Sequence, residues 1–458
     1  MDRTRELFTP AVKGMVAALG GDMVLKALGL AATFITLQVL DPFQYGLWQL
    51  LLSVAGAFGF VTIPGIASML VAEVSREYGA GRKREGNGIA VRAAGLFVLL
   101  SACGALCMMV AAPFIKELSG IDIVRIAQIL AVSVFAIGVR QAYGLALHSR
   151  MQFFHVQSMK VLDRFSYLVW IVVFLGYLQY GVEGVVYAYV LSNLTSVVCY
   201  APYILSLYRE MYANQAKDDW QPFVTSSWDR GKWVMGTDFV NTFTGTVWPW
   251  VVGYFLDVEA VGIIGITILL LGQVASFVPV SYVLRSILPR TSETPERMRE
   301  WLYRSMKFSM WGHMLSGIMA FAACVVVFPW WFPQHSGAIP LFAVLLLSLP
   351  LRGLTTSVTE WFYATGHQRD LFFVSALPKL AITAFLPLFL WAGGMMGYAL
   401  WYLLSTDVVL LSRLARVSRA LGARFGIREI MILDRVDMGL FARGAALITS
   451  KITARFAR

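Results

Sequence analysis

Five charged side chains lie inside long apolar stretches of the sequence, where a charge is energetically expensive. They are Asp22, Lys26, Arg140, Asp238 and Arg352. At the centre of a lipid-facing helix each such residue costs about 2.5 to 3.5 kcal/mol on insertion scales. Five of them would cost on the order of 12 to 17 kcal/mol, which is comparable with the net stability of a whole fold. We therefore expect these side chains to face a water-filled cavity or one another.

The basic members of this set have the chemistry to bind an anion. A guanidinium presents its donors in a planar fork that fits the oxygens of a phosphate group. We expect Arg140, Arg352 and Lys26 to form a cationic, substrate-binding lumen. Pro350, two residues before Arg352, predicts a broken helix of the kind that lines a cavity. The alternative for Arg352 is a structural ion pair with Glu360, two helical turns further on.

The acidic members are candidates for coupling to protons. Asp22 and Lys26 are four residues apart, so on a helix they share one face and can instead neutralise each other as a structural pair. Asp238 has Thr242 at the corresponding position, so it needs a partner from another helix or must bind a proton for part of the time. Asp22 and Asp238 are therefore the two candidate proton-coupling residues.

The elements that position these residues are membrane-spanning helices. Apolar residues make up 58% of the chain and charged residues only 14%, and the mean hydropathy is +0.66. Spanning takes about 20 mostly apolar residues. Such runs occur at residues 14–38, 44–69, 91–115, 124–147, 160–178, 184–208, 232–255, 260–284, 306–331, 338–362, 371–391 and 396–416. The sequence therefore predicts an all-α polytopic membrane protein with about 12 transmembrane helices.

Basic residues predict which side of the membrane each connection faces. Of the 38 Lys and Arg residues, 33 fall in or beside alternate connections and the termini, whereas Lys116 and Arg125 lie on the opposite side and three lie within spans. By the positive-inside rule the basic side is cytoplasmic. We expect a multi-pass protein of the bacterial cytoplasmic (inner) membrane with both termini in the cytoplasm. This topology accounts for the net charge of +11 and does not indicate nucleic-acid binding.

Three further basic residues lie near the cytoplasmic ends of predicted helices. They are Arg92, Lys160 and Lys379. Long basic side chains at such positions commonly extend to the membrane interface only to reach water. The alternative is that they make the first cytoplasmic contact with an anionic headgroup.

Two stretches of the chain are alike. LDPFQYGLWQ (40–49) and LDVEAVGIIG (256–265) share a Leu-Asp pair with a glycine five residues after the aspartate. The same offset of 216 residues pairs Gly20 with Gly236, Asp22 with Asp238 and Pro113 with Pro329. The sequence thus predicts two pseudo-symmetric six-helix bundles, related by an axis along the membrane normal, with a pathway between them.

The repeat and the charge pattern together predict the domain organisation. We expect a cytoplasmic amino end (1–13), a first six-helix bundle (14–208), a cytoplasmic linker (209–231) and a second six-helix bundle (232–416). A basic cytoplasmic tail (417–458) follows, with the pattern of an amphipathic helix that binds anionic membrane lipids.

The motifs of nucleotide-driven pumps and of hydrolases are missing from the sequence. It contains no GxxxxGK[ST] phosphate loop, no HExxH zinc site and no nucleophile elbow. The connections predicted on the outer side are mostly short, which leaves little room for an active site. We expect no enzymatic activity, no cofactor and no bound metal.

The segment ATFITLQVLDPFQYGLWQLLLSVAGAFGFVTIPGIASMLVAEVSREYGAG (32–81) resembles the amino-terminal signature of Wzx-like polysaccharide flippases, the polysaccharide transporter branch of the multidrug/oligosaccharidyl-lipid/polysaccharide superfamily. In these proteins an LGPxxYGxW/F turn follows the first helix, and a basic loop follows the second. Here the turn is LDPFQYGLW, with Asp41 in place of the usual glycine. The resemblance implies the superfamily fold and the translocation of polyprenyl-diphosphate-linked oligosaccharides for surface polysaccharide biosynthesis.

The same resemblance implies ion-gradient-driven alternating access and partners in polysaccharide assembly, namely a polymerase and glycosyltransferases. Two other functions remain open. A multidrug/cation antiporter of the same superfamily would favour an acidic or aromatic lumen. A lipid II flippase usually carries two additional helices, which the charged tail does not supply.

Overall fold

The computed structural model describes residues 2–59, 64–119, 124–216, 221–278, 284, 295–422, 425 and 430–432. Over these residues the chain is helical between short turns, and no strand occurs. The predicted all-α class is therefore confirmed. The predicted amphipathic tail lies mostly outside the described residues.

The described residues of the first half form seven α-helices and one π-helical turn. They are α1 (Asp2–Val39), α2 (Pro42–Gly59), α3 (Pro64–Gly79), α4 (Lys83–Ser119), α5 (Val124–Ser149), α6 (Phe153–Ile171), η2 (Val172–Tyr177) and α7 (Gly181–Ala213). Each apolar run predicted in this half overlaps these helices. The run at 44–69 is shared between α2 and α3, and that at 160–178 between α6 and η2.

The second half contains further long helices, two of which are interrupted. They are α8 (Gln221–Phe255), α9 (Val258–Ser276), α11 (Pro295–Trp331), the 3₁₀ turn η4 (Pro333–His335), α12 (Ala338–Leu346), α13 (Ser348–Ala364), α14 (Gln368–Thr383) and α15 (Leu386–Leu421). A 44° bend separates α12 from α13, which confirms the predicted break. The bend precedes Pro350, whose ring would collide with the carbonyl four residues earlier in a straight helix. Within α15, Gly394 has non-helical backbone angles (φ 55°, ψ −134°).

Seven of the described helices are long and apolar enough to cross a membrane, and the bent pair α12–α13 makes up to eight. The protein is therefore a multi-pass membrane protein. The arrangement of about twelve spans in two six-helix bundles stays a prediction. The helices α6 and α8, which carry Asp163 and Asp238, are not among these seven.

Contacts divide the chain into two compact units. Unit 1 comprises Met1–Leu269, Cys324–Leu341 and Thr383–Tyr398, and unit 2 comprises Leu270–Ala323, Phe342–Ile382 and Ala399–Arg458. The helices α9, α11, α12 and α15 each contribute one part to each unit.

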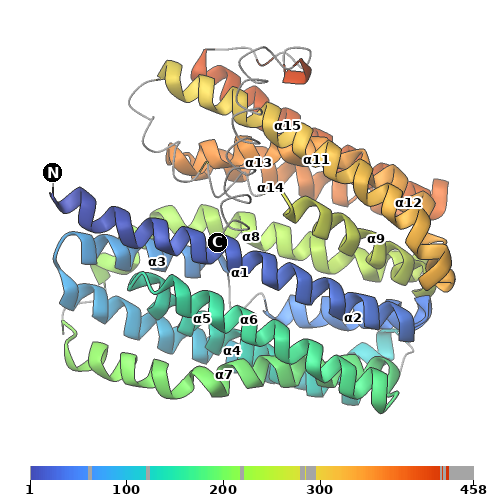
Figure 1. Cartoon of the computed structure of the whole chain (residues 1–458), viewed down its shortest axis with the longest axis horizontal. Coiled ribbons are helices and arrows are strands. Elements are labelled where there is room, and N and C mark those ends of the chain that lie inside the picture. Colours follow the sequence, from blue (N-terminus) through green and yellow to red (C-terminus); the bar gives the residue numbers. More distant parts are fainter. Residues whose placement is uncertain are drawn as a thin grey trace, which may run out of the picture. The chain divides into compact units, whose positions relative to one another are not determined.

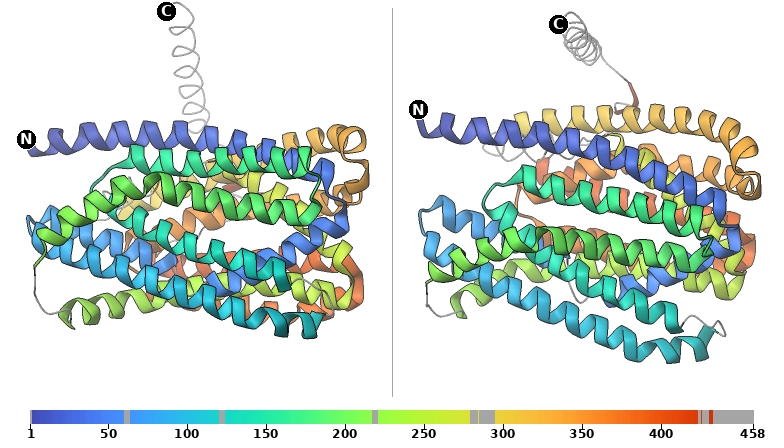
Figure 2. Two further views of the ribbon diagram at one scale, coloured as in Figure 1. Left: turned by 90° about the horizontal axis from the view of Figure 1, so that it is seen from below. Right: turned by 60° about the horizontal axis from the view of Figure 1, so that its bottom comes forward.

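Unit 1 is built around the helices of the first half. α4 packs on α5, α7 packs on α5 and α6, and α1 lies along α6 (Figures 1 and 2). The side chains between them are mostly small or aliphatic, and Ala90, Ala146 and Leu147 are fully buried. Small residues let helix backbones approach closely, which is a main source of packing energy between helices in a bilayer.

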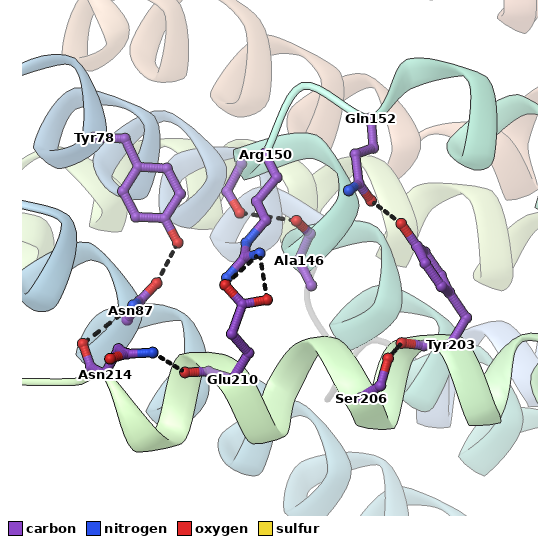
Figure 3. Close-up of polar contacts among 10 residues, drawn as sticks. Tyr78, Asn87, Ala146, Arg150, Gln152, Tyr203, Ser206, Glu210 and Asn214 are labelled. Carbon is purple, nitrogen blue, oxygen red and sulfur yellow. Dashed lines mark hydrogen bonds and ion pairs between the residues drawn. The ribbon is translucent and has the colours of Figure 1, made fainter.

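A polar network joins the ends of α3, α4, α5 and α7 (Figure 3). Arg150 forms an ion pair with Glu210 at 3.1 Å, and the Asn214 side chain donates to the Glu210 carbonyl. Asn87 accepts a hydrogen bond from the Tyr78 hydroxyl at 2.6 Å and donates one to the Asn214 carbonyl. The network therefore fixes the relative positions of four helix ends, on the side predicted to be cytoplasmic.

The two repeated stretches meet in unit 1, where α2 crosses the first part of α9. A Cβ atom on Gly46 would lie 1.9 Å from the carbonyl oxygen of Val258, and one on Gly262 would lie 1.9 Å from that of Pro42. Each of these contacts becomes the other when the 216-residue offset is applied. The crossing is therefore pseudo-symmetric, like an isologous interface about a twofold axis.

The aspartate of each repeated stretch caps the helix that follows it. Asp41 Oδ1 accepts a hydrogen bond from the Gln44 backbone N–H at 2.7 Å, and Asp257 Oδ1 accepts one from that of Ala260 at 2.6 Å. Each carboxylate thereby satisfies an amide of the first turn that has no partner within the helix. The repeated Asp and Gly thus have two physical causes, a helix cap and a backbone crossing.

The end of α1 is capped by residues from the second half of the chain. The carbonyl oxygens of Leu37 and Leu40 each accept a hydrogen bond from His335 Nε2 at 3.0 Å, and from Gln334 Nε2 at 3.2 and 3.1 Å. Because Nε2 of His335 carries the proton, its buried Nδ1 is unprotonated, and Nδ1 has no hydrogen-bond partner among the described residues. Burial lowers the pKa of His335 from its usual value.

Unit 2 has its apolar core between α11, α13, α14 and α15. Its nearly inaccessible side chains include Met306, Val358, Phe362 and Val417. α13 approaches α11 closely at Gly353, where an added Cβ would lie 2.7 Å from the Ser309 carbonyl oxygen. This close approach fixes the position of the adjacent Arg352.

The glycine crossing predicts the effect of one methyl group. Gly262→Ala forces α2 and α9 apart, because a carbonyl oxygen occupies the place of the new Cβ. We expect a destabilisation of about 3 kcal/mol or more, at the upper end of the range for overpacking. The measurement is the melting temperature and the monodisperse yield in detergent.

The matched control is Gly272→Ala on the same helix, where an added Cβ meets no heavy atom within 4 Å. We expect this variant to be neutral or more stable by about 0.5 to 1 kcal/mol. If Gly262→Ala had the same melting temperature as the wild type, the close crossing of α2 and α9 would be contradicted.

The His335 cap predicts a pH-dependent stability. The pKa of His335 is lower in the folded protein than the unfolded value of about 6.5, so the unfolded chain binds the proton first. The contribution of His335 is therefore fully present above about pH 6.5 and is lost as the pH falls below it. We expect the melting temperature to fall between about pH 7.5 and pH 5.5, and to fall less in His335→Gln. The exposed His367→Gln serves as control and should keep the wild-type profile.

Candidate functional site

Arg140 on α5 is paired with Asp163 on α6. Nη1 lies 2.7 Å from Oδ1, and the two side chains keep 25% and 19% of their accessible surface. The helices are consecutive and joined by a short turn. Arg140 lies nine residues before α5 ends at Ser149, and Asp163 lies ten residues after α6 begins at Phe153. The two residues are therefore at about the same distance from the turn that joins the helices. The guanidinium expected in a cationic lumen is thus balanced by a carboxylate.

The surroundings of this pair are polar and incompletely bonded. Asp163 Oδ1 has no geometrically sound hydrogen bond among the described residues, so the Arg140 guanidinium is close to it but poorly aligned. Tyr189 on α7 lies within electrostatic reach of both charges. Asn193, one turn further along α7, is 2% exposed, and its Oδ1 lacks a donor in the described part of the chain. The pair therefore lies in a region with spare hydrogen-bonding capacity.

Asp22 and Asp238, the candidates for proton coupling, have different environments. Asp22 on α1 accepts a long hydrogen bond of 3.4 Å from Gln157 Nε2 on α6, and so has a partner on another helix. Lys26, one turn further on, is half-buried. Asp238 on α8 is also half-buried, and no hydrogen bond or ion pair joins it to another described residue. Their roles in proton coupling stay predictions.

Three basic side chains gather in unit 2. The Arg413 guanidinium on α15 donates from Nη1 to Thr359 Oγ1 on α13 at 2.6 Å, and from Nε to Ser375 Oγ on α14 at 2.8 Å. Both acceptors are neutral, so they orient the guanidinium without cancelling its charge. Within the described residues no carboxylate forms an ion pair with Arg413.

Lys379 and Arg352 extend this positive charge along the same helices. Lys379 follows Ser375 by one turn on α14, and Arg352 precedes Thr359 by two turns on α13, so each shares a helix face with a hydroxyl that holds Arg413. The charges of Arg413 and Arg352 both act on Lys379. We call Arg352, Lys379 and Arg413 the cationic cluster.

The cationic cluster is suited to an anion. Like charges at short range repel strongly in a low-dielectric interior, and an anion between them removes that repulsion. The charge of Arg352 acts on His313 of α11 and on Lys379. The ion pair between Arg352 and Glu360 stays a prediction. Two guanidinium forks and an ammonium match the oxygens of phosphate groups.

The three basic residues predicted to contact an anionic headgroup have different surroundings. Lys379 belongs to the cationic cluster, whereas Lys160 is exposed on α6 and Arg92 is half-buried on α4. A headgroup contact at Lys160 and Arg92 stays a prediction.

Two functional candidates escaped prediction. Arg413 lies near the end of the predicted span 396–416 and was not singled out, whereas α15 continues to Leu421 and places Arg413 two turns inside the helix. The hydroxyls that hold it carry no recognisable sequence pattern. Asp163 had a usable signal, because it and Arg140 are equally far from the turn between α5 and α6.

Comparison with known families gives one match. The profile of a family described as polysaccharide biosynthesis protein matches residues 11–294. No curated protein sequence matches the chain.

Comparison with solved structures gives the fold. The chain is similar to an inward-facing multidrug resistance MATE family transporter of the MOP superfamily, with 16% identity, a TM-score of 0.70, and coverage of 87% of this chain and 95% of that one. It is also similar to a mutant of the Vibrio cholerae MATE transporter VcmN, with 14% identity, a TM-score of 0.63, and coverage of 92% and 98%. A third is a Pyrococcus furiosus MOP superfamily transporter described as having a binding pocket of reverse polarity, with 16% identity, a TM-score of 0.58, and coverage of 90% and 95%.

The cationic cluster predicts binding of a simple diphosphate. Inorganic pyrophosphate at saturating concentration should raise the melting temperature of the purified protein by several degrees, because a ligand at 100 times its Kd stabilises by about 2.7 kcal/mol. Arg352→Ala and Arg413→Ala should each lose most of this shift. Arg369→Ala, which removes an exposed arginine of α14, is the matched control and should keep it. An unchanged shift in both cluster variants would contradict an anion site here.

Proposed function

Because the chain belongs to the polysaccharide biosynthesis protein family, we propose that it is a flippase for polyprenyl-diphosphate-linked oligosaccharide repeat units. It moves them across the bacterial cytoplasmic membrane for the assembly of a surface polysaccharide. The lipid tail stays in the bilayer, and the diphosphate and the sugar chain pass through the protein. Its partners are then the polymerase and glycosyltransferases of the assembly system.

The observation that carries this proposal is the cationic cluster. A diphosphate is the most highly charged part of such a cargo, and it needs a site whose positive charge is not already neutralised. Arg413 is held by Thr359 and Ser375, which are neutral, and therefore keeps its full charge for a ligand. Sequence reasoning had proposed Arg140, Arg352 and Lys26 for this role. Of these, Arg352 belongs to the cationic cluster, whereas Arg140 is paired with Asp163 when no cargo is bound.

The energy source is an ion gradient, used by alternating access. The sequence has no nucleotide-binding loop. Asp22 and Asp238 occupy corresponding positions of the two repeats and are the carboxylates proposed to exchange protons. The topology that goes with this mechanism has both termini in the cytoplasm and the pathway between two six-helix bundles.

A multidrug/cation antiporter is the second candidate function. The similarity in fold to MATE transporters favours it, although fold alone does not determine cargo. The cationic cluster opposes it, because three basic side chains repel an organic cation. A lipid II flippase would share the diphosphate chemistry and differs only in the sugar part of the cargo.

Transport in proteoliposomes tests the proposal. The purified protein should move a fluorescent, short-chain prenyl diphosphate-linked sugar between leaflets and should not move a cationic dye. Arg352→Ala should reduce the initial rate at least about tenfold, which corresponds to 1.4 kcal/mol of lost binding or transition-state stabilisation. Arg369→Ala is the control and should transport normally. Movement of the dye without the lipid-linked sugar would establish the antiporter instead.

A further inference from the structure

We propose that Asp163 is an internal substitute for the cargo's phosphate. When no cargo is bound, the Asp163 carboxylate forms an ion pair with the Arg140 guanidinium. When the diphosphate of the cargo binds Arg140, it displaces Asp163, which then takes up a proton. Cargo binding and proton binding are thereby coupled at one ion pair. This inference rests on the proposed function, since it requires a cargo with phosphate groups.

The geometry of the pair suits exchange better than permanent structure. A structural ion pair inside a protein stabilises only when well-aligned hydrogen bonds satisfy its remaining polar atoms. Here Nη1 and Oδ1 are 2.7 Å apart, yet Oδ1 has no well-aligned hydrogen bond among the described residues. The attraction is therefore mainly charge on charge. A phosphate offers the same charge with a better fit to the guanidinium fork.

The pair is partly exposed. The side chains of Arg140 and Asp163 keep 25% and 19% of their surface. The Arg140 guanidinium can therefore bind an anion in place of the Asp163 carboxylate, whose Oδ1 is itself buried. On α7, one turn from Tyr189, the buried Asn193 Oδ1 has no donor among the described residues.

Once it is displaced, the Asp163 carboxylate is negatively charged and no longer has Arg140 as its partner, which is energetically unfavourable. Removing one partner of a buried pair leaves an uncompensated charge, and a carboxylate escapes this cost by binding a proton. Besides Asp163, α6 carries His155, Lys160, Arg164 and Tyr167. The charged or titratable groups of the helices around it are Arg140 of α5, Tyr45 of α2, Tyr189 of α7, and Asp22 and Lys26 of α1. Arg164 is exposed, so Arg140 is the principal cation beside Asp163.

The exchange balances in charge and in atoms. One Arg140–carboxylate ion pair is replaced by one Arg140–phosphate ion pair, and one proton from the solvent forms one O–H bond on Asp163. Release of the cargo reverses both steps, because the returning carboxylate loses its proton as it pairs with Arg140. No covalent bond of the cargo changes. Asp163 thus competes with the cargo for the Arg140 guanidinium.

Calorimetric titration with farnesyl diphosphate in two buffers of different ionisation enthalpy tests this exchange, because it measures both affinity and proton uptake. We expect the wild type to take up about one proton more per bound ligand than Asp163→Asn. At about pH 8, Asp163→Asn should bind about tenfold more tightly than the wild type, because the competing carboxylate is gone. Any protonation of the ligand itself is common to both proteins and cancels in the comparison.

Three further variants make the result specific. Asp163→Ser is a second neutral replacement and should behave like Asp163→Asn, whereas Asp163→Glu should restore the proton uptake. Asp370→Asn removes the carboxylate of another Arg–Asp pair, in which Arg416 Nη2 lies 2.6 Å from Asp370 Oδ2. It should bind and take up protons like the wild type.

The outcomes separate the two proposals. If the wild type binds farnesyl diphosphate but the neutral Asp163 variants match it in affinity and proton uptake, the exchange is wrong and the proposed function stands. If they bind more weakly, the pair is structural and the exchange is again wrong. If neither the wild type nor any Asp163 variant binds the ligand, the proposed function fails together with the inference.

Discussion

Where α2 crosses α9, the carbonyl groups of Pro42 and Val258 occupy the space that side chains on Gly262 and Gly46 would need. This contact joins the two copies of the repeat through their backbones and fixes the distance between them. The helix caps at Asp41 and Asp257 lie at the start of the same helices, so both ends of the contact are anchored by hydrogen bonds.

The interior charges do not follow the symmetry of that crossing. In unit 1, Arg140 is balanced by Asp163, whereas in unit 2 the arginines Arg352 and Arg413 have no such carboxylate among the described residues. The two units therefore carry different chemistry. Arg140 can bind an anion only after Asp163 has been displaced. Arg413 is held by neutral hydroxyls and attracts an anion at all times.

Sequence patterns predicted what depends on local composition. Apolar runs gave the helices, Pro350 gave the bend between α12 and α13, and the 216-residue offset paired Gly46 with Gly262. Contacts between helices were harder to predict, because rotation about each helix axis decides which side chains meet. The hydrogen bond between Asp22 and Gln157 of α6 was not predicted, because only residues of its own helix could be placed beside Asp22 from the sequence. The hydroxyls around Arg413 have no distinctive spacing, so only three-dimensional packing reveals them.

The cap on the end of α1 has a consequence for biosynthesis. The carbonyls of Leu37 and Leu40 accept hydrogen bonds from Gln334 and His335. The ribosome adds these two donors nearly 300 residues after it has added the acceptors. Ribosomes add about 5 to 20 residues per second, so the interval is on the order of 15 to 60 seconds. During that time the end of α1 lacks these donors, and water or an assembly factor must donate hydrogen bonds to its carbonyls. Although α1 is made long before η4, it is thus among the last of these helices to form all its hydrogen bonds.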